Sequence, residues 1–261
     1  MNKDKYQNTI LQLREFMKGY TELEEDIVSD QNEKIAQPPL EKGCIGSKII
    51  PLTKEFETLM KQNNYLELLN NRTSKRNYSL DPLSLDELSF LLWATQGVKS
   101  VIGKERKATM RTVPSAGARH PFETYIFVNR VEGLEAGLYH YIALEHKLEF
   151  IQKIENQVDR LSEATLGQVF YANSAVAFAW TVMPYRTEWR YTIKAHKYAL
   201  LDAGHLCQSL YFASEALGLG SCAIGAYDQK LFDQLLNLDS APSYENSNEF
   251  VVYAASVGKL K

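Results

Sequence analysis

Two basic segments of the sequence carry residues suited to binding a phosphate. Arg72-Thr73-Ser74-Lys75-Arg76 places three cations and two hydroxyls directly before a predicted helix. Guanidinium forks and hydroxyls donate well to phosphate oxygens. The chain ends with Gly258-Lys259-Leu260-Lys261, a second basic cluster that could reach the same phosphate. Taken alone, a solvated basic turn and a charged tail explain these clusters more simply.

Small residues mark two places where backbone could lie close to a flat ligand such as a flavin ring. Pro114-Ser115-Ala116-Gly117-Ala118 lies in a turn-rich stretch before a predicted strand, and Gly225-Ala226 follows the apolar segment 222–224. Residues 218–223 satisfy the pattern G-x-G-x-x-A. That match follows a helix and enters a strand, which is the reverse of the Rossmann order, so we discard it.

Lys197 and Tyr198 are candidates for acid–base chemistry on a long predicted helix. A lysine desolvated in a pocket can act as a base if burial depresses its pKa. An exposed lysine beside a core tyrosine is the alternative explanation. The five histidines never stand in a compact metal-ligand spacing, and no G-x-S-x-G elbow occurs, so metal-dependent and serine hydrolases have little support. We therefore predict no metal site.

Composition excludes several classes of protein. The 29 basic and 32 acidic side chains give a net charge of −3, so no basic excess indicates a nucleic-acid partner. The first residues contain no apolar signal segment, and the apolar run 175–183 is shorter than the roughly 20 residues that span a bilayer. We expect a cytoplasmic protein without a membrane partner. Its three cysteines fit reduced thiols better than a disulfide framework.

The remaining pattern interleaves strands and helices within one domain. A capping box of Ser84 and Glu87 predicts the start of one helix, and Gly97 predicts its end. Gly218 ends a second, longer helix. Small and apolar residues occupy most of its circumference, so we predict that it is buried nearly all round. After a short first helix, residues 18–54 are predicted to be an extended arm. The predicted helices are 56–70, 84–97, 191–217 and 229–236; the predicted strands are 123–129, two within 137–151, 175–183, 222–227 and 250–257; and 239–248 is predicted to be a polar loop. The hairpin near residue 140 argues against a doubly wound parallel sheet and favours an α+β fold with a mixed sheet.

Four segments in series resemble the nitroreductase superfamily, and specifically its SagB-type dehydrogenase branch. They are RTSKRNYSLDPLSLDELSFLLWATQGV, RTVPSAGARHPFETYIFV, GLYHY and KYALLDAGHLCQSLYFASEALGLGSCAIGAYD. The resemblance runs from about Tyr65 to the C-terminus. Because the predicted arm ends at residue 54 and a helix is predicted from residue 56, we divide the chain into an N-terminal arm, 1–54, and an FMN-binding domain, 55–261. It implies a three-layer α/β/α homodimer with a mixed, mainly antiparallel sheet and FMN at the subunit interface.

The resemblance also implies a role for individual residues. The phosphate and ribityl end of FMN would be held by Arg72, Thr73 and Ser74, with Arg76 near the pyrimidine edge. Pro114, Ser115 and Ala116 would come from the partner subunit, and Ile224, Gly225 and Ala226 would lie near N5. Gln168 would contact the pyrimidine side, and Lys259 or Lys261 the phosphate. Lys197 and Tyr198 match the Lys-Tyr pair that azoline-oxidising members use as a base.

Three functions are compatible with these residues. The first is ping-pong transfer of hydride from NADPH or NADH, a transient reductant, through FMN to a small organic acceptor such as a nitroaromatic or quinone. The alternative is a SagB-type azoline dehydrogenase that oxidises thiazoline or oxazoline rings in a modified peptide and works with a cyclodehydratase. The third is a non-catalytic flavin-binding protein.

Overall fold

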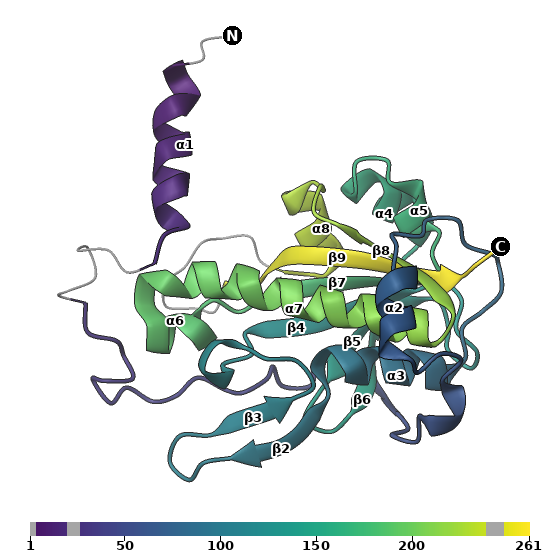
Figure 1. Ribbon diagram of the computed structural model, residues 1–261, viewed down its shortest axis with the longest axis horizontal. Coiled ribbons are helices and arrows are strands. Elements are labelled where there is room, and N and C mark those ends of the chain that lie inside the picture. The colour runs from purple at the N-terminus through teal and green to yellow at the C-terminus, as the bar shows by residue number, and fades with distance from the viewer. Residues whose placement is uncertain (1–3, 20–26, 239–247) are drawn as a thin grey trace.

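The computed structural model describes residues 4–19, 27–238 and 248–261, and a seven-stranded sheet forms its middle layer (Figure 1). Across the sheet the strand order is β1-β6-β5-β4-β7-β9-β8, and each pair of neighbours is antiparallel. The strands are β1 Lys48–Pro51, β4 Phe122–Val128, β5 Gly137–Ile142, β6 Lys147–Gln152, β7 Val176–Val182, β8 Leu219–Ile224 and β9 Phe250–Lys259. A separate hairpin pairs β2 Val98–Ile102 with β3 Ala108–Arg111.

Helices cover both faces of the sheet. One face packs against α3 Leu85–Gln96 and α7 Ala195–Ala216, with α2 Tyr65–Asn71 lying on α7. The other face packs against α4 Gln157–Ala164, α5 Val169–Ala172 and α8 Gln229–Leu235. Successive residues of β4 belong to the two cores in turn, since Ile126 faces α3 and α7 whereas Phe127 faces α8. The predicted α+β fold with helices on both sides of a mainly antiparallel sheet is confirmed. The parallel pairing that a mixed sheet implies does not occur between the described strands.

The predicted helix 56–70 is wrong in its first half. A single 3-10 turn, Glu57–Leu59, is followed by a break, and α2 begins only at Tyr65. Asn64 accounts for this start, because its side chain accepts hydrogen bonds from the backbone N–H groups of Leu66 and Glu67. A capping asparagine therefore decides where the helix begins, although the apolar spacing continues through it.

The long predicted helix differs in its start and in its burial. Residues 185–191 form the separate helix α6 Tyr185–Tyr191, and Thr192, with φ 50°, separates it from α7. The side of α7 that carries Leu200 and Leu201 is open, and these residues are 56% and 54% exposed. The prediction of burial nearly all round is wrong for a single chain. Residues 239–247, most of the predicted polar loop, lie outside the described residues.

Part of the predicted arm is integrated into the body. β1 pairs with β6 at one edge of the sheet. The backbone N–H of Lys42 donates to Glu123 at 2.7 Å, and those of Ile45 and Gly46 donate to Glu149 at 2.8 and 2.6 Å. Neither the strand nor these contacts could be expected from a segment without periodicity. The division into an arm, 1–54, and a domain, 55–261, stays a prediction.

Those two glutamates belong to a buried ionic network. Between them lies His140, whose Nε2 is 2.9 Å from Glu123 and whose Nδ1 is 2.7 Å from Glu149. Arg186 donates to Glu123 at 2.5 Å, and the ammonium of Lys42 pairs with Glu249 at 2.6 Å. The arm is therefore joined to β4 and β6 by backbone hydrogen bonds to Glu123 and Glu149, and to Glu249 by an ion pair.

Helix α1 Asp4–Phe16 stands clear of the body (Figure 1). Near its base, the ammonium of Lys197 donates to the carbonyls of Met17 and Lys18 at 2.6 and 2.9 Å. Over the residues that the structure describes, no helix combines the length and the apolar character needed to cross a membrane.

Candidate functional site

The basic turn 72–76 lies against the C-terminal part of α7 and the strand β8. Ser74 Oγ is 2.9 Å from the hydroxyl of Tyr211 on α7, and that hydroxyl also accepts a hydrogen bond from the backbone N–H of Ala223 at 2.9 Å. The guanidinium of Arg72 lies over the Tyr211 ring, 5.5 Å from its centre. One tyrosine therefore links the basic turn to β8.

A second group of contacts lies where β8 ends. Gln168 donates from Nε2 to the carbonyl of Ala226 at 2.6 Å, and the guanidinium of Arg76 lies 5.5 Å from the centre of the Phe170 ring on α5. Gly225 and Ala226 are exposed, and a Cβ added at Gly225 would meet no atom within 4 Å. We call Arg72, Ser74, Arg76, Gln168, Gly225 and Ala226 the β8 cluster.

The cations of the β8 cluster are available to an anion. Within the described residues, neither Arg72 nor Arg76 is paired with a carboxylate, although the neighbouring Lys75 forms an ion pair with Glu215 at 2.6 Å. Aromatic rings hold both guanidinium groups from one side. Two unpaired guanidinium groups beside a hydroxyl and an open glycine fit a ligand that joins a phosphate to a flat ring.

The loop 114–117, with sequence PSAG, is held by a different part of α7. Ser115 Oγ donates to Asp202 Oδ2 at 2.5 Å, and the N–H of Ala116 donates to Asp202 Oδ1 at 3.2 Å. Burial raises the pKa of Asp202, and the hydrogen bond from Ser115 opposes that rise. The N–H of His120 closes the loop onto Ser115 Oγ at 2.9 Å. Asp202 thus fixes the loop to the first half of α7.

The PSAG loop and the β8 cluster lie apart on one chain. Asp202 holds the loop and Tyr211 holds the cluster, and these residues are nine positions apart on one helix, about 14 Å along its axis. The contacts of Ser115 and Ala116 are with Asp202 and His120, and Pro114 is exposed. A single chain therefore does not bring the two halves of the predicted site together.

Tyr198 is linked to the PSAG loop through Tyr191, whereas the side chain of Lys197 contacts the segment that follows α1. The ring of Tyr198 lies 4.9 Å from the ring of Tyr191. A Cβ added at Gly117 would be 2.5 Å from the hydroxyl of Tyr191, so the loop packs closely there. Lys197 is turned toward the base of α1. Both candidate base residues lie in the half of α7 remote from the β8 cluster.

The other predicted ligands are more scattered. Ile224 is buried at the end of β8. Lys259 pairs in register with Leu219 at the far end of that strand, about 17 Å from Ile224. Its ammonium is 3.9 Å from Glu87, the residue that completes the capping box of α3. Thr73 and Lys261 are exposed. Their roles stay predictions.

Sequence reasoning missed three residues of this site. Tyr211 and Phe170 carried no signal, because an aromatic residue on an apolar helix is usually part of the core. Asp202 could have been found from the sequence, because it lies between the apolar residues Leu201 and Ala203, and a buried carboxylate needs hydrogen-bond donors. No group of histidine, cysteine or acidic side chains within the described part of the chain could hold a metal ion.

The chain belongs to the nitroreductase family, whose family model matches residues 69–259. It is 33% identical over 177 residues to "Putative nitroreductase MJ1384" of Methanocaldococcus jannaschii, an alignment that covers 67% of this chain and 85% of the relative. It is 31% identical over 148 residues to the trifolitoxin-processing protein TfxB of Rhizobium leguminosarum bv. trifolii, covering 55% of this chain and 39% of TfxB. The family resemblance read from the sequence is confirmed, and the TfxB match agrees with its SagB-type branch.

Solved structures share the fold at low sequence identity. A nitroreductase-like chain from Anabaena variabilis superposes with a TM-score of 0.71 at 22% identity, covering 96% of this chain and 46% of that one. A chain of the Escherichia coli microcin synthetase McbBCD complex, solved with truncated pro-MccB17 bound, superposes with a TM-score of 0.58 at 17% identity, covering 100% and 95%. This chain therefore spans less than half of the Anabaena chain and of TfxB.

Proposed function

We propose that this protein is an FMN-dependent oxidoreductase that works as a homodimer. The observation that carries the proposal is the β8 cluster, in which two guanidinium groups without carboxylate partners flank a hydroxyl and an open glycine. When bound, FMN supplies the two-electron redox chemistry, so the protein needs chiefly to bind and orient the ring and exclude water. Family membership supports the oxidoreductase class.

In this proposal Arg72 and Ser74 bind the phosphate, and Tyr211 keeps the Ser74 hydroxyl beside β8. Arg76 lies at the end of β8, where it can donate to polar atoms of the ring. Gln168 donates both hydrogens of Nε2 to the carbonyls of Thr165 and Ala226, so it can accept a hydrogen bond from the ring through Oε1. The open backbone at Gly225 lets the ring approach closely, because a side chain there would occupy the same space.

A second chain would complete the site. The open side of α7 carries Lys197, Leu201, Gly204 and Gln208 at helical spacing, and a Cβ at Gly204 would meet nothing within 4 Å. A glycine allows two helices to approach closely. Positions 197 and 211 are each seven residues from 204, so antiparallel packing of two α7 helices centred there would bring the partner's Lys197 to Tyr211. By the same symmetry the partner's position 202 would face position 206, about 7.5 Å along the axis from Tyr211, so the partner's PSAG loop would lie nearer the β8 cluster than the loop of the same chain does.

The activity we propose first is reduction of a small organic acceptor, such as a nitroaromatic or quinone, at the expense of NADPH or NADH. The second candidate is oxidation of an azoline ring in a modified peptide. Lys197 and Tyr198, in the half of α7 that holds the PSAG loop, favour it, because across the dimer interface they would place an amine and a phenol at the ring. Lys197 would first have to leave the carbonyls of Met17 and Lys18. The similarity to TfxB supports a peptide substrate.

Anaerobic absorption spectra of the purified protein test these alternatives. If NADPH or NADH bleaches the oxidised-flavin bands, the protein is a reductase. If only an azoline peptide bleaches them, it is a dehydrogenase. If bound flavin is bleached by none of these, the non-catalytic flavin-binding protein is favoured, and failure to bind FMN after reconstitution would refute the proposal.

Lys197→Ala separates the two catalytic candidates. We expect this variant to lose azoline oxidation and to keep NADPH-driven nitro reduction, because only the first reaction needs a base to take a proton from the substrate. Lys230→Ala, an exposed lysine on α8, is the matched control and should retain both. Equal loss of both activities in Lys197→Ala would contradict the role assigned to Lys197.

A further inference from the structure

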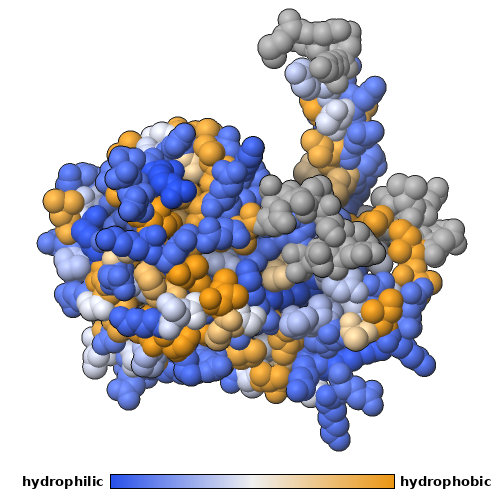
Figure 2. Space-filling model, turned by 180° about the vertical axis from the view of Figure 1, so that it is seen from behind, coloured by the Kyte–Doolittle hydropathy of each residue, from blue (hydrophilic) through white to orange (hydrophobic). Residues whose placement is uncertain are grey.

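Helix α1 presents an apolar stripe that no described residue of its own chain covers. One face of the helix carries Tyr6, Ile10 and Leu13, and Met17 directly after its last residue continues this face; the four residues stand at positions i, i+4, i+7 and i+11 and are 52%, 46%, 58% and 64% exposed. Figure 2 shows the helix projecting from the body with apolar side chains on its surface. An isolated helix of this length is only marginally stable in water. The α1 stripe therefore needs a surface to pack on.

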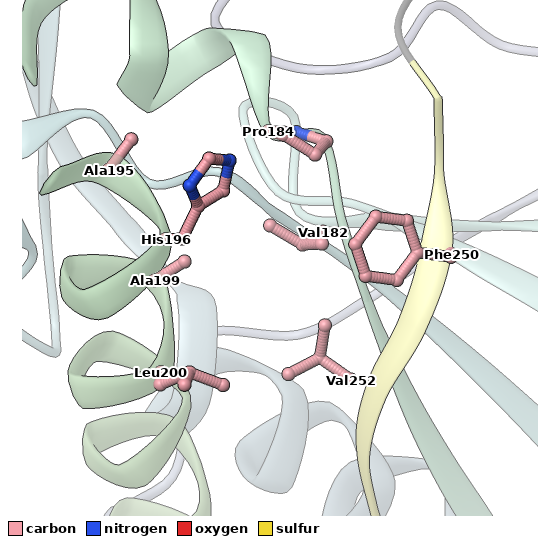
Figure 3. Close-up of a pocket in the computed structure, with 8 residues that line it drawn as sticks. All are labelled: Val182, Pro184, Ala195, His196, Ala199, Leu200, Phe250 and Val252. Atoms are coloured by element: carbon pink, nitrogen blue, oxygen red, sulfur yellow. The ribbon is translucent and has the colours of Figure 1, made fainter. Parts of the chain in front are cut away.

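An apolar pocket of about 210 Å³ lies between α7 and β9. Ala199 and Leu200 of α7 face Phe250 and Val252 of β9 across it, with Val182 between them (Figure 3). The residues lining it include no acidic residue, lysine or arginine. Since packed protein interiors leave few voids larger than a water molecule, a surface pocket of this character fits apolar side chains.

The α1 stripe does not reach the pocket of its own chain. The carbonyls of Met17 and Lys18 are held by Lys197 on the first turn of α7, and from that point the helix leads away from the body (Figure 1). Each of its described side chains is exposed. Among the described residues, therefore, the α1 stripe packs on no surface, and the apolar pocket beside α7 is filled by no side chain.

We propose that the α1 stripe of each chain packs into the apolar pocket of a second copy, so that two chains exchange their N-terminal helices. A two-fold dimer pairs every stripe with a pocket and leaves neither unmatched, which is how isologous interfaces close. The pocket is continuous with the open side of α7, because Leu200 belongs to both. The partner's Lys197, which holds the base of the partner's α1, would face Tyr211, about 17 Å along α7 from Leu200. The partner's α1, about 20 Å long, must therefore turn to lie along α7 in order to reach the pocket. The inference rests on the dimer proposed above and adds α1 to its interface.

Disulfide trapping between differently tagged chains tests the exchange. In a Cys44→Ser background, which removes the one exposed cysteine among the described residues, one chain carries Ile10→Cys and the other Val252→Cys. After mild oxidation of the co-expressed chains we expect a covalent heterodimer on a non-reducing gel. Gln12→Cys, on the opposite side of α1, is the matched control and should cross-link at least tenfold less. Cross-linking at equal yield from Gln12→Cys, or none from Ile10→Cys, would overturn the exchange.

A chain that carries both Ile10→Cys and Val252→Cys separates exchange from self-packing. A covalent dimer supports the inference, whereas a cross-linked monomer overturns it. Hydrogen exchange of the unmodified protein provides a readout that needs no variant. We expect amides of residues 4–16 to be protected at concentrations where the protein is dimeric and to lose that protection on dilution. Rapid exchange at every concentration would refute docking of α1.

Ile10→Asp shows whether the exchange stabilises the dimer. Because each dimer loses two buried aliphatic contacts, we expect its dissociation constant to rise roughly 100-fold, with Gln12→Asp as the control. A dimer that binds FMN and shows no effect of Ile10→Asp would refute the inference and leave the proposed function intact. A monomer that binds no FMN would refute both.

Discussion

Raising the pH from neutral should weaken this fold through one buried side chain, His140. Its two ring nitrogens each face a carboxylate, Glu123 on one side and Glu149 on the other, and all three groups are buried. A neutral imidazole has a single N–H and cannot donate to both. The arrangement therefore requires the imidazolium form. Burial by itself would disfavour that charge, but the hydrogen bonds to Glu123 and Glu149 outweigh it and raise the pKa of His140 to about 9.

The expected magnitude follows from the difference between folded and unfolded chains. The pKa of His140 rises from 6.5 to about 9 on folding, and each tenfold change in proton affinity is worth about 1.4 kcal/mol. Its contribution is fully present below pH 6.5, and it is lost as the pH rises to 9, because the unfolded chain releases this proton first. The free energy of unfolding should therefore fall by about 3 kcal/mol across that range.

Urea unfolding at a series of pH values and constant ionic strength measures this change. His140→Gln removes the titrating group, so the difference in pH dependence between the two proteins isolates His140 from other titrating groups. His205→Gln, at a partly exposed histidine of α7, is the control and should keep the slope of the unmodified protein. A slope that His140→Gln leaves unchanged would refute the reasoning.

Loss of His140 leaves two carboxylates facing each other, which could prevent folding altogether. In that case, an NMR titration of the imidazole resonances of His140 in the unmodified protein measures its pKa directly. A titration midpoint near or below 6.5 would show that the two carboxylates do not hold the proton.

Three further perturbations test the site and the packing around it. Arg72→Ala should weaken FMN binding by about 1.5 to 3 kcal/mol if it donates to the phosphate, and calorimetry that shows unchanged affinity would exclude that contact. Leu201→Asp on the open side of α7 should give monomers that retain the fold but lose most bound flavin, as light scattering and absorbance would report; a flavin-loaded monomer would show that one chain suffices. Gly258→Ala should destabilise the protein by about 1 to 3 kcal/mol, because its Cβ would lie 2.9 Å from the Tyr78 ring, and denaturant unfolding at unchanged midpoint would contradict that crowding.

Local patterns in the sequence predicted much of the fold. The capping box of Ser84 and Glu87 forms as predicted, because both of its hydrogen bonds are local. The start of α2 also has a local cause, the cap formed by Asn64, but the apolar spacing that predicts a helix over 56–70 continues through this residue. The edge strand β1 could not be predicted, because its stability comes from pairing with β6, about 100 residues away.

For the candidate site, residue types were easier to predict than their grouping. Gln168 and Phe170 bring Ala226 and Arg76 of the basic turn to the same end of α5, a grouping that residue types alone did not predict and that only the family resemblance implied. The separation of the PSAG loop from them depends on Asp202 and Tyr211, which hold the two groups to different turns of α7. Such a separation follows from tertiary packing, and no spacing in the sequence encodes it.

The hydrogen bonds of Lys197 to the base of α1 give one ammonium two tasks. It closes the open carbonyls of Met17 and Lys18, and it is also the proposed base. If α1 binds a second chain, the association of the two chains determines how firmly Lys197 is held by the carbonyls of Met17 and Lys18. The same association then determines how often the Lys197 amine is free to take a proton from a substrate. Specific activity toward an azoline would then change with enzyme concentration, whereas nitro reduction by intact dimers would not depend on the state of α1. The rate of azoline oxidation would then report how many of the N-terminal helices are bound to a second chain.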